Sequence, residues 1–169
     1  AGEVARIAAA ARRPLLAMVE TPVGVIAAPA IARAGGVAGL IAGTNDLAAG
    51  LRLPADAGRQ ALMLALQAIV LASRATDVLA FDGVFNRLDD PAGLEAECRE
   101  GRRLGFDGKT LIHPGQIAVA NRTFSPSEQE VEEARALIEA ATGGAERFRG
   151  RMIEAMHVAA ARRLLSLAA

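Results

Sequence analysis

The chain has 169 residues, enough for one domain with a buried core. Apolar residues make up 52% and charged residues 22%, and 19 basic residues balance 19 acidic ones, which argues against a disordered chain and against the basic surface of a nucleic-acid-binding protein. A single cysteine, Cys98, excludes an intramolecular disulfide and a cysteine-based zinc site, and no apolar run approaches the roughly 18 residues of a membrane span.

Helical and apolar segments alternate along the first three quarters of the chain. Apolar runs that end in turn residues predict buried parallel strands, and spaced apolar residues between them predict helices. In chain order the sequence predicts a helix over 2–12, a strand over 14–20, a helix over 24–34, a strand over 37–43, a helix over 55–75, a strand over 78–84, a helix over 90–104, a strand over 109–113 and a helix over 114–121.

Two further helices follow this alternation. Ser125-Pro126-Ser127 begins a charged amphipathic helix that runs to about residue 141, and residues 152–168 form the last predicted helix after a break at Thr142-Gly143-Gly144. Repeated βα units predict an α/β fold with a parallel sheet, either open and doubly wound or part of a (β/α)₈ barrel. Four strands are too few for a closed barrel, and no GxGxxG follows any strand, which counts against dinucleotide binding.

Two carboxylates lie at the ends of consecutive predicted strands. Glu20 ends the first strand and Asp46 lies just beyond the second. Ligands bind at this end of parallel strands, and Mg²⁺ prefers one or two carboxylates together with water and substrate oxygens. The alternative is that Glu20 caps the helix beginning near Pro22 and that Asp46 caps a turn at Leu47.

The turn that precedes Asp46 has a second possible role. Gly43, Thr44 and Asn45 follow a strand, and the backbone N–H groups of such a turn bind carboxylate or phosphate oxygens, although an ordinary βα turn looks the same. We interpret Asp82, His113 and Cys98 as structural residues, and His157 as a surface or interface residue; the other possibilities are a site-facing Asp82 and a general base or metal ligand at His113.

Several segments together resemble the citrate lyase β-subunit-like family of the HpcH/HpaI aldolase superfamily. The most specific is Gly105-Phe-Asp-Gly-Lys-Thr-Leu-Ile-His-Pro-Gly-Gln-Ile117. The other matching segments, in their order and spacing, are Leu16–Thr21, Gly43–Ala48, Phe124–Ser127 and Gly150–Glu154. Together they cover nearly the whole chain.

The resemblance implies a Mg²⁺-dependent carbon–carbon lyase on a (β/α)₈ barrel. Its substrate would be a 3-hydroxyacyl-CoA thioester of the citryl-CoA or malyl-CoA type, and its products an acyl-CoA thioester and an α-keto acid. In the family the residues that match Glu20 and Asp46 hold the metal, and the backbone around Gly43, Thr44 and Asn45 helps to hold the keto acid carboxylate. We therefore expect a cytoplasmic enzyme whose partners include neither nucleic acid nor membranes.

The resemblance also divides the chain. Residues 1–124 would be the C-terminal half of the barrel, with strands five to eight, and residues 125–169 a C-terminal helical extension between subunits. Glu154 matches a family Asp that reaches over a neighbour's barrel mouth and handles a proton, which implies a homo-oligomer, a trimer or a hexamer. The acidic "LEDAV"-like segment and the "R-x-N" segment of the family's N-terminal half do not occur in this sequence.

Two other functions stay open at this stage. A non-catalytic chain retained for assembly or acyl-CoA binding fits the missing motifs. A class II pyruvate aldolase acting on free hydroxy-keto acids fits less well, because the 105–117 segment and the C-terminal extension argue against it.

Overall fold

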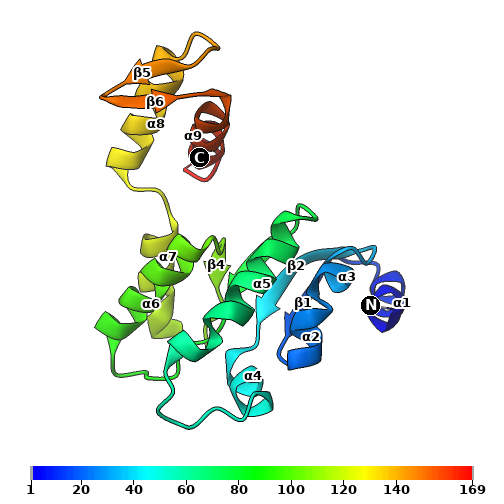
Figure 1. The fold of residues 1–169 in the computed structure, drawn as a ribbon. Helices are drawn as coiled ribbons and strands as arrows, with labels where there is room; N and C mark the ends of the chain where they lie inside the picture. Colours follow the sequence, from blue (N-terminus) through cyan, green and yellow to red (C-terminus); the bar gives the residue numbers. More distant parts are fainter. Residues whose placement is uncertain (1, 169) are drawn as a thin grey trace. The chain divides into compact units, whose positions relative to one another are not determined.

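The structure is a computed structural model that describes residues 2–168. These residues fall into two units, which are divided between residues 120 and 121. The first unit is an α/β domain (Figure 1). Its elements are α1 (Gly2–Ala11), β1 (Leu15–Val19), α2 (Pro22–Ile26), α3 (Ala28–Ala32), β2 (Val37–Ala42), α4 (Thr44–Gly50), the 3₁₀ turn η1 (Arg59–Leu62), α5 (Met63–Arg74), β3 (Leu79–Asp82), α6 (Pro91–Leu104), β4 (Gly108–Lys109), the 3₁₀ turn η2 (Pro114–Gln116) and the start of α7 (Ile117–Phe124).

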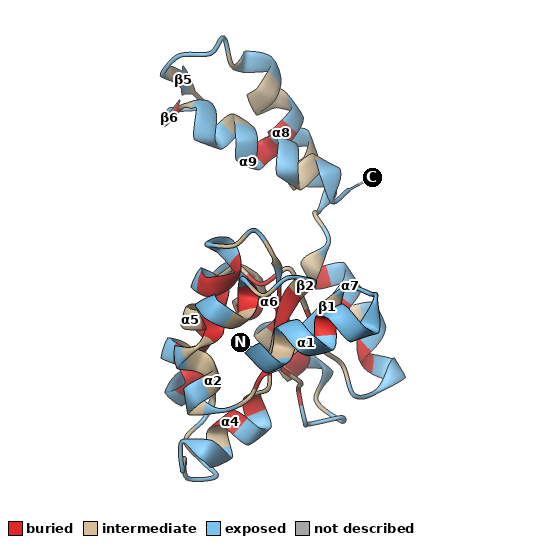
Figure 2. Cartoon of the chain, turned by 90° about the vertical axis from the view of Figure 1, so that its right-hand side faces the viewer, coloured by how far each residue is buried: buried red, intermediate tan, exposed pale blue. Residues whose placement is uncertain are grey.

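The four strands form one parallel sheet in the order β1-β2-β3-β4. Helices α3 and α5 pack on β2, and α6 packs on β4. The core lies between these helices and the strands, where Leu40, Leu66 and Ile69 have no exposed surface, and Figure 2 shows the buried residues gathered in these elements. Within residues 2–168 no helix is long and apolar enough to cross a bilayer.

One face of the sheet stays open in this unit. Val19, Leu40 and Ala80 are buried, but Leu16 and Met18, which alternate with Ala17 and Val19 along β1, are 51% and 53% exposed. Leu79 of β3 pairs through Gly39 of β2 with Leu16 and is 46% exposed. The helices therefore cover one face of the sheet, and apolar side chains are exposed on the other.

Several predicted elements need correction. The predicted helix over 24–34 is two helices, because Pro29 has no N–H to continue a helix and α3 begins around it. The predicted helix over 55–75 begins only with η1, since Gly58 has a positive φ of 66°. The fourth strand ends at Lys109 rather than 113, because the chain turns and the Ile112 N–H donates to the Gln116 side chain. Helix α4 was not predicted.

The second unit holds the end of α7 and then α8 (Glu128–Ala140), β5 (Glu146–Phe148), β6 (Arg151–Ile153) and α9 (Ala155–Ser166). Ser127 caps α8 in a capping box with Glu130. The two strands form an antiparallel hairpin that the sequence analysis missed, so the last helix begins at Ala155 instead of 152. Helices α8 and α9 pack against each other, with Ala134 and Ala161 buried.

Candidate active site

The carboxyl ends of β1 and β2 bring Glu20 and Gly43 side by side. Val19 pairs with Ala42 in the parallel ladder, and the Gly43 N–H donates to the Val19 carbonyl at 3.0 Å. A Cβ at Gly43 would lie 2.4 Å from the Glu20 Cβ, so only glycine leaves room for Glu20 there. Asp46 is exposed in the first turn of α4, three residues further on. Both predicted carboxylates therefore come from the same edge of the sheet.

The segment that follows β3 holds the turn that runs from Gly43 to Asp46. Thr44 is buried and lies against Gly83, where a Cβ would be 2.4 Å from the Thr44 Oγ1. Asn45 and Asn86 form a reciprocal amide pair: the Asn86 Nδ2 donates to the Asn45 Oδ1 at 2.7 Å, and the Asn45 Nδ2 donates back at 3.3 Å. Asn86 was not singled out from the sequence, because nothing in its neighbourhood marks it as the partner of a residue 41 positions earlier.

A cavity of about 420 Å³ opens beside this turn. Thr44 and Asn45 line it, together with Asn86, but Glu20 and Asp46 are not among its lining residues. Its polar wall also holds Arg59 and Glu97, and its apolar wall includes Leu62 and Phe85. The predicted substrate-binding residues Thr44 and Asn45 thus face a cavity, while the two carboxylates lie outside its lining.

Behind the cavity lies a cluster of ion pairs centred on Asp82, which is fully buried. The Arg59 guanidinium donates to both Asp82 oxygens at 2.9 and 3.0 Å, and the Lys109 Nζ donates to Asp82 at 3.0 Å. Lys109 also pairs with Glu97 at 2.6 Å. Although burial lowers the pKa of Arg59, its ion pairs with Asp82 and Glu97 raise that pKa above the ordinary value overall. The structural interpretation of Asp82 is therefore confirmed.

His113 and Cys98 likewise have structural roles. The His113 Nδ1 accepts a hydrogen bond from the Gly115 N–H at 3.1 Å, which caps η2. Cys98 is a buried free thiol in α6, and burial raises its pKa, so the thiol stays protonated at neutral pH.

The chemistry of the edge fits a hard divalent cation. Among residues 2–168 no three His, Cys, Asp or Glu side chains gather into a protein-only metal cage. Mg²⁺ does not require one, since it keeps several waters and takes one or two carboxylates together with substrate oxygens. Glu20 and Asp46, from neighbouring strand ends, are a donor set of this kind.

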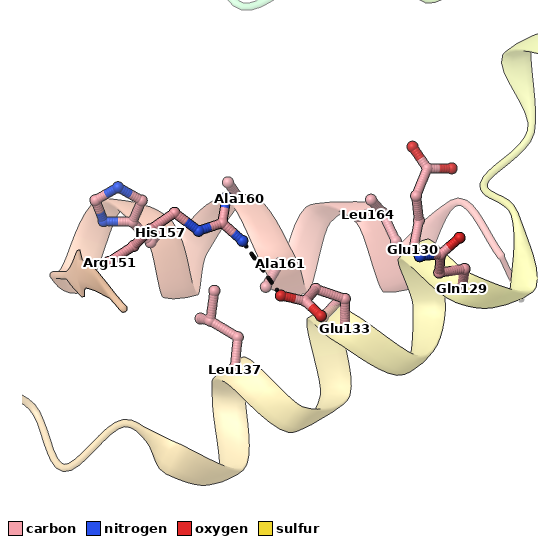
Figure 3. A pocket seen from close by; sticks show the side chains of 10 residues that line it. Gln129, Glu130, Glu133, Leu137, Arg151, His157, Ala160, Ala161 and Leu164 are labelled. Carbon is pink, nitrogen blue, oxygen red and sulfur yellow. Dashed lines mark hydrogen bonds and ion pairs between the residues drawn. The ribbon is translucent and has the colours of Figure 1, made fainter. Parts of the chain in front are cut away.

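Glu154 lies in the second unit, at the N-cap of α9. It is half-buried with an extended backbone, and its N–H donates to the His157 Nδ1 at 3.0 Å. His157, an exposed residue, also lines a groove of about 670 Å³ between α8 and α9 (Figure 3). In this groove the Arg151 guanidinium donates to Glu133 at 3.3 Å over an apolar floor that includes Leu137.

Comparisons with known proteins identify the family of this chain. A family profile described as HpcH/HpaI aldolase/citrate lyase matches residues 3–114. A (3S)-malyl-CoA thioesterase of Cereibacter sphaeroides (strain ATCC 17025 / ATH 2.4.3) is 44% identical over 162 residues, which cover 92% of this chain and 56% of the relative. The citrate lyase subunit beta of Escherichia coli (strain K12) is 34% identical over 161 residues, which cover 91% of this chain and 53% of that protein.

A solved structure extends the comparison to the fold. The protein CitE from Mycobacterium tuberculosis, in complex with magnesium, acetoacetate and coenzyme A, superposes with a TM-score of 0.83 and 32% identity over 98% of this chain and 64% of that one. The chain spans about half the length of the curated relatives it matches.

Proposed function

Because the chain belongs to the HpcH/HpaI aldolase/citrate lyase family, we propose that it carries part of a Mg²⁺-dependent carbon–carbon lyase site. The substrate is a 3-hydroxyacyl-CoA thioester of the citryl-CoA or malyl-CoA type, and the products are an acyl-CoA thioester and an α-keto acid. The observation that supports the proposal is that Glu20 and Asp46 follow the carboxyl ends of two neighbouring strands. Gly43, which has no side chain, leaves room for Glu20 there.

Each residue at the edge has a separate role in this proposal. The carboxylates of Glu20 and Asp46 hold the cation, and the backbone N–H groups of Thr44 and Asn45, in the first turn of α4, hold the carboxylate of the keto acid. Gly43 shapes this turn, because its own N–H already donates to the Val19 carbonyl. When bound, Mg²⁺ supplies a Lewis acid that polarises the keto acid carbonyl. The cation and the backbone N–H groups hold the keto acid at two points, which orients its carbonyl toward the α-carbon of the acyl-CoA. Orientation of this kind is a large part of catalysis.

The sheet itself supports assignment of residues 1–124 to half of a barrel. Four parallel strands follow one another in chain order, and helices cover only one face, whereas a doubly wound sheet has helices on both. The open face with Leu16, Met18 and Leu79 matches the inward face of a barrel, which is filled by side chains from all eight strands.

The proton step is assigned to residues 125–169. In this proposal the protein is a homo-oligomer, a trimer or hexamer. Glu154 lies on the extension of a neighbouring subunit and accepts or donates the proton. A carboxylate at a helix N-cap, half-exposed after a short hairpin, is available for such a contact. To transfer the proton, the Glu154 carboxylate must come within about 2.6–3.2 Å of the reacting group.

Hydrolysis of the thioester is the second candidate. The relative that is 44% identical is a (3S)-malyl-CoA thioesterase, and the same substrate class serves both reactions. Cleavage of the carbon–carbon bond of malyl-CoA leaves the thioester intact in acetyl-CoA and releases glyoxylate. Hydrolysis instead breaks the thioester and releases free coenzyme A and malate.

One assay separates these reactions. The whole protein that contains this chain is incubated with malyl-CoA or citryl-CoA and Mg²⁺. The keto acid is measured as its phenylhydrazone, and free coenzyme A is measured with a thiol reagent. The proposal predicts release of keto acid without stoichiometric release of thiol. Release of keto acid should be lost when Mg²⁺ is removed and in the Asp46→Asn variant. It should be retained in the matched control Asp56→Asn, because Asp56 is an exposed loop residue. Thiol release with no keto acid favours the thioesterase, and neither product from either thioester contradicts both candidates.

A further inference from the structure

The segment between β3 and α6, residues 83–86, contacts two consecutive residues of the proposed keto acid turn. Gly83 lies against the buried side chain of Thr44, and Asn86 pairs with Asn45 through two amide hydrogen bonds of 2.7 and 3.3 Å. Both contacts come from the 83–86 segment, so this segment holds the turn.

The 83–86 segment is itself fixed to the core of the first unit. The Gly83 N–H donates to the Asp82 Oδ1 at 2.8 Å, and Asp82 is held by Arg59 and Lys109. At the other end, the buried Gln116 Nε2 donates to the Phe85 carbonyl at 2.9 Å. Phe85 is only 3% exposed. The segment is therefore anchored at Gly83 and at Phe85, the residue that precedes Asn86.

From this chain of contacts we infer that Asn86 is a positioning residue, which sets the orientation of Asn45 and of the first turn of α4 through their amide pair. The pair is exposed and neutral, so neither amide is needed to satisfy a buried group. Its effect is geometric: an amide pair fixes both side-chain rotamers, and the turn that carries Asn45 also carries Asp46. The inference rests on the proposed function for the role of Asn45, but the contacts stand apart from it.

The orientation of the Asn45 side chain affects the surface of the cavity beside the turn. Asn45 and Asn86 both line it, so a rotated Asn45 would change the surface that faces a ligand there. Displacement of a binding group by about 1 Å is enough to lower catalysis strongly, even when the fold is kept. Because Asn86 lines the same cavity, the double variant described below separates its effect through Asn45 from a direct contact with the ligand.

The test uses the three asparagines of the chain. In the full chain we compare Asn86→Ala, Asn45→Ala and the double variant with Asn121→Ala, an exposed residue of α7 that serves as the matched control. Three quantities are measured: the thermal midpoint, the affinity for the α-keto acid pyruvate in saturating Mg²⁺ by calorimetry, and the hydrogen exchange of the Asp46 and Leu47 amides. The Leu47 N–H, which donates to the Gly43 carbonyl at 3.0 Å, reports on the turn directly.

We expect Asn86→Ala to keep the thermal midpoint of Asn121→Ala but to weaken pyruvate binding about three- to tenfold, the effect of one lost hydrogen bond. Exchange at Leu47 should become faster by a similar factor. Because the two amides act as a unit, the double variant should bind no more weakly than Asn45→Ala.

Unchanged exchange at Leu47 in Asn86→Ala, or additive losses of affinity in the double variant, would overturn the inference. Faster exchange in Asn86→Ala combined with no pyruvate binding by the unaltered chain would support the positioning role and contradict the proposed function instead. A lowered thermal midpoint that accounts for the whole loss of affinity would assign Asn86 a merely structural role and also overturn the inference.

Discussion

At the residue scale, Gly43 decides how closely two neighbouring strand ends approach. Its missing side chain leaves space that the Glu20 Cβ fills, and the same residue begins the turn that leads to Asp46. Its φ of −84° is open to any residue, so the requirement for glycine is steric rather than conformational. A single methyl group placed there would act on the proposed metal ligand directly.

Gly43→Ala should therefore lower stability by about 1–3 kcal/mol, the usual cost of overpacking, and should displace Glu20. Gly35→Ala is the matched control, because a Cβ at Gly35 meets nothing within 4 Å. The unfolding free energy from urea titration checks the first effect and Mg²⁺ affinity the second. Equal urea midpoints for the two variants would show that the space at Gly43 has no energetic importance.

Residue patterns predicted the carboxylates but not their surroundings. Glu20 and Asp46 were found because each follows an apolar strand, which is a local signal. Asn86 and Arg59 were not, because their roles come from contacts 41 and 23 positions away in the chain, with Asn45 and Asp82. The structural role of Asp82 was foreseen from its place inside a strand, yet its partners were not, since ion pairs leave no periodic signal.

At the element scale, helix α6 shows how local capping sets a boundary. Asp90 accepts a hydrogen bond from the Gly93 N–H at 2.8 Å, Pro91 occupies the first turn, and Gly105 ends the helix with a φ of 99°. These residues made the predicted bounds of 90–104 almost coincide with the observed Pro91–Leu104. The C-terminal half of α6 contains Gly101, where a Cβ would lie 2.7 Å from an Asp82 oxygen. Glycine there lets the helix pack against the ion-pair cluster.

The cap of α6 predicts a pH dependence. The hydrogen bond from Gly93, with a further one from Arg87, lowers the pKa of Asp90 below its ordinary value. The resulting stability is fully present above the unfolded pKa of about 3.9 and disappears as the pH falls through the lower folded pKa. The thermal midpoint of Asp90→Asn should therefore lie below that of the unaltered chain at neutral pH and approach it in acid.

The exposed neighbour Asp89 provides the control for this titration, because Asp89→Asn leaves the cap in place. Thermal midpoints of the three proteins are measured from neutral pH down to the onset of acid unfolding. A gap between Asp90→Asn and the unaltered chain that stays constant across this range would show that the charge of Asp90 contributes nothing to the cap.

Elements without a long periodic run were the ones predicted poorly. The β5–β6 hairpin has strands of three residues each, too short for an alternation to be recognised. Its signal was Gly150, which with Arg149 forms a two-residue turn at positive φ values of 80° and 46° between the paired Phe148 and Arg151. The apolar run at 109–113 gave the opposite error, because most of it pairs with no strand.

At the scale of the whole molecule, the proposed function gives a role to the open face of the sheet and to residues 125–169. Leu16, Met18 and Leu79 are apolar side chains that a complete barrel would enclose. Residues 125–169 add nothing to the four-stranded sheet and carry Glu154. In the proposed function, each active site combines an edge from one subunit with a carboxylate from another.

Shared sites predict that two inactive variants restore each other. Glu154→Gln removes the proton-handling carboxylate and Asp46→Asn removes a metal ligand, so each homogeneous oligomer should have little lyase activity. In mixed oligomers formed at equal proportions, about a quarter of the sites would combine an intact Asp46 with an intact Glu154 from different subunits. Turnover of malyl-CoA should recover accordingly. Stable mixed oligomers without recovery would exclude a site shared between subunits.

The central claim is that Glu20 and Asp46 together form a divalent cation site, and the free Mn²⁺ signal in electron paramagnetic resonance tests it most directly. Mn²⁺ takes the same oxygen ligands as Mg²⁺. We predict one saturable site per chain, which competes with Mg²⁺, is lost in Glu20→Gln and in Asp46→Asn, and is kept in Asp56→Asn. Binding that is unchanged in both Glu20→Gln and Asp46→Asn, or no binding by the unaltered chain, would contradict the claim.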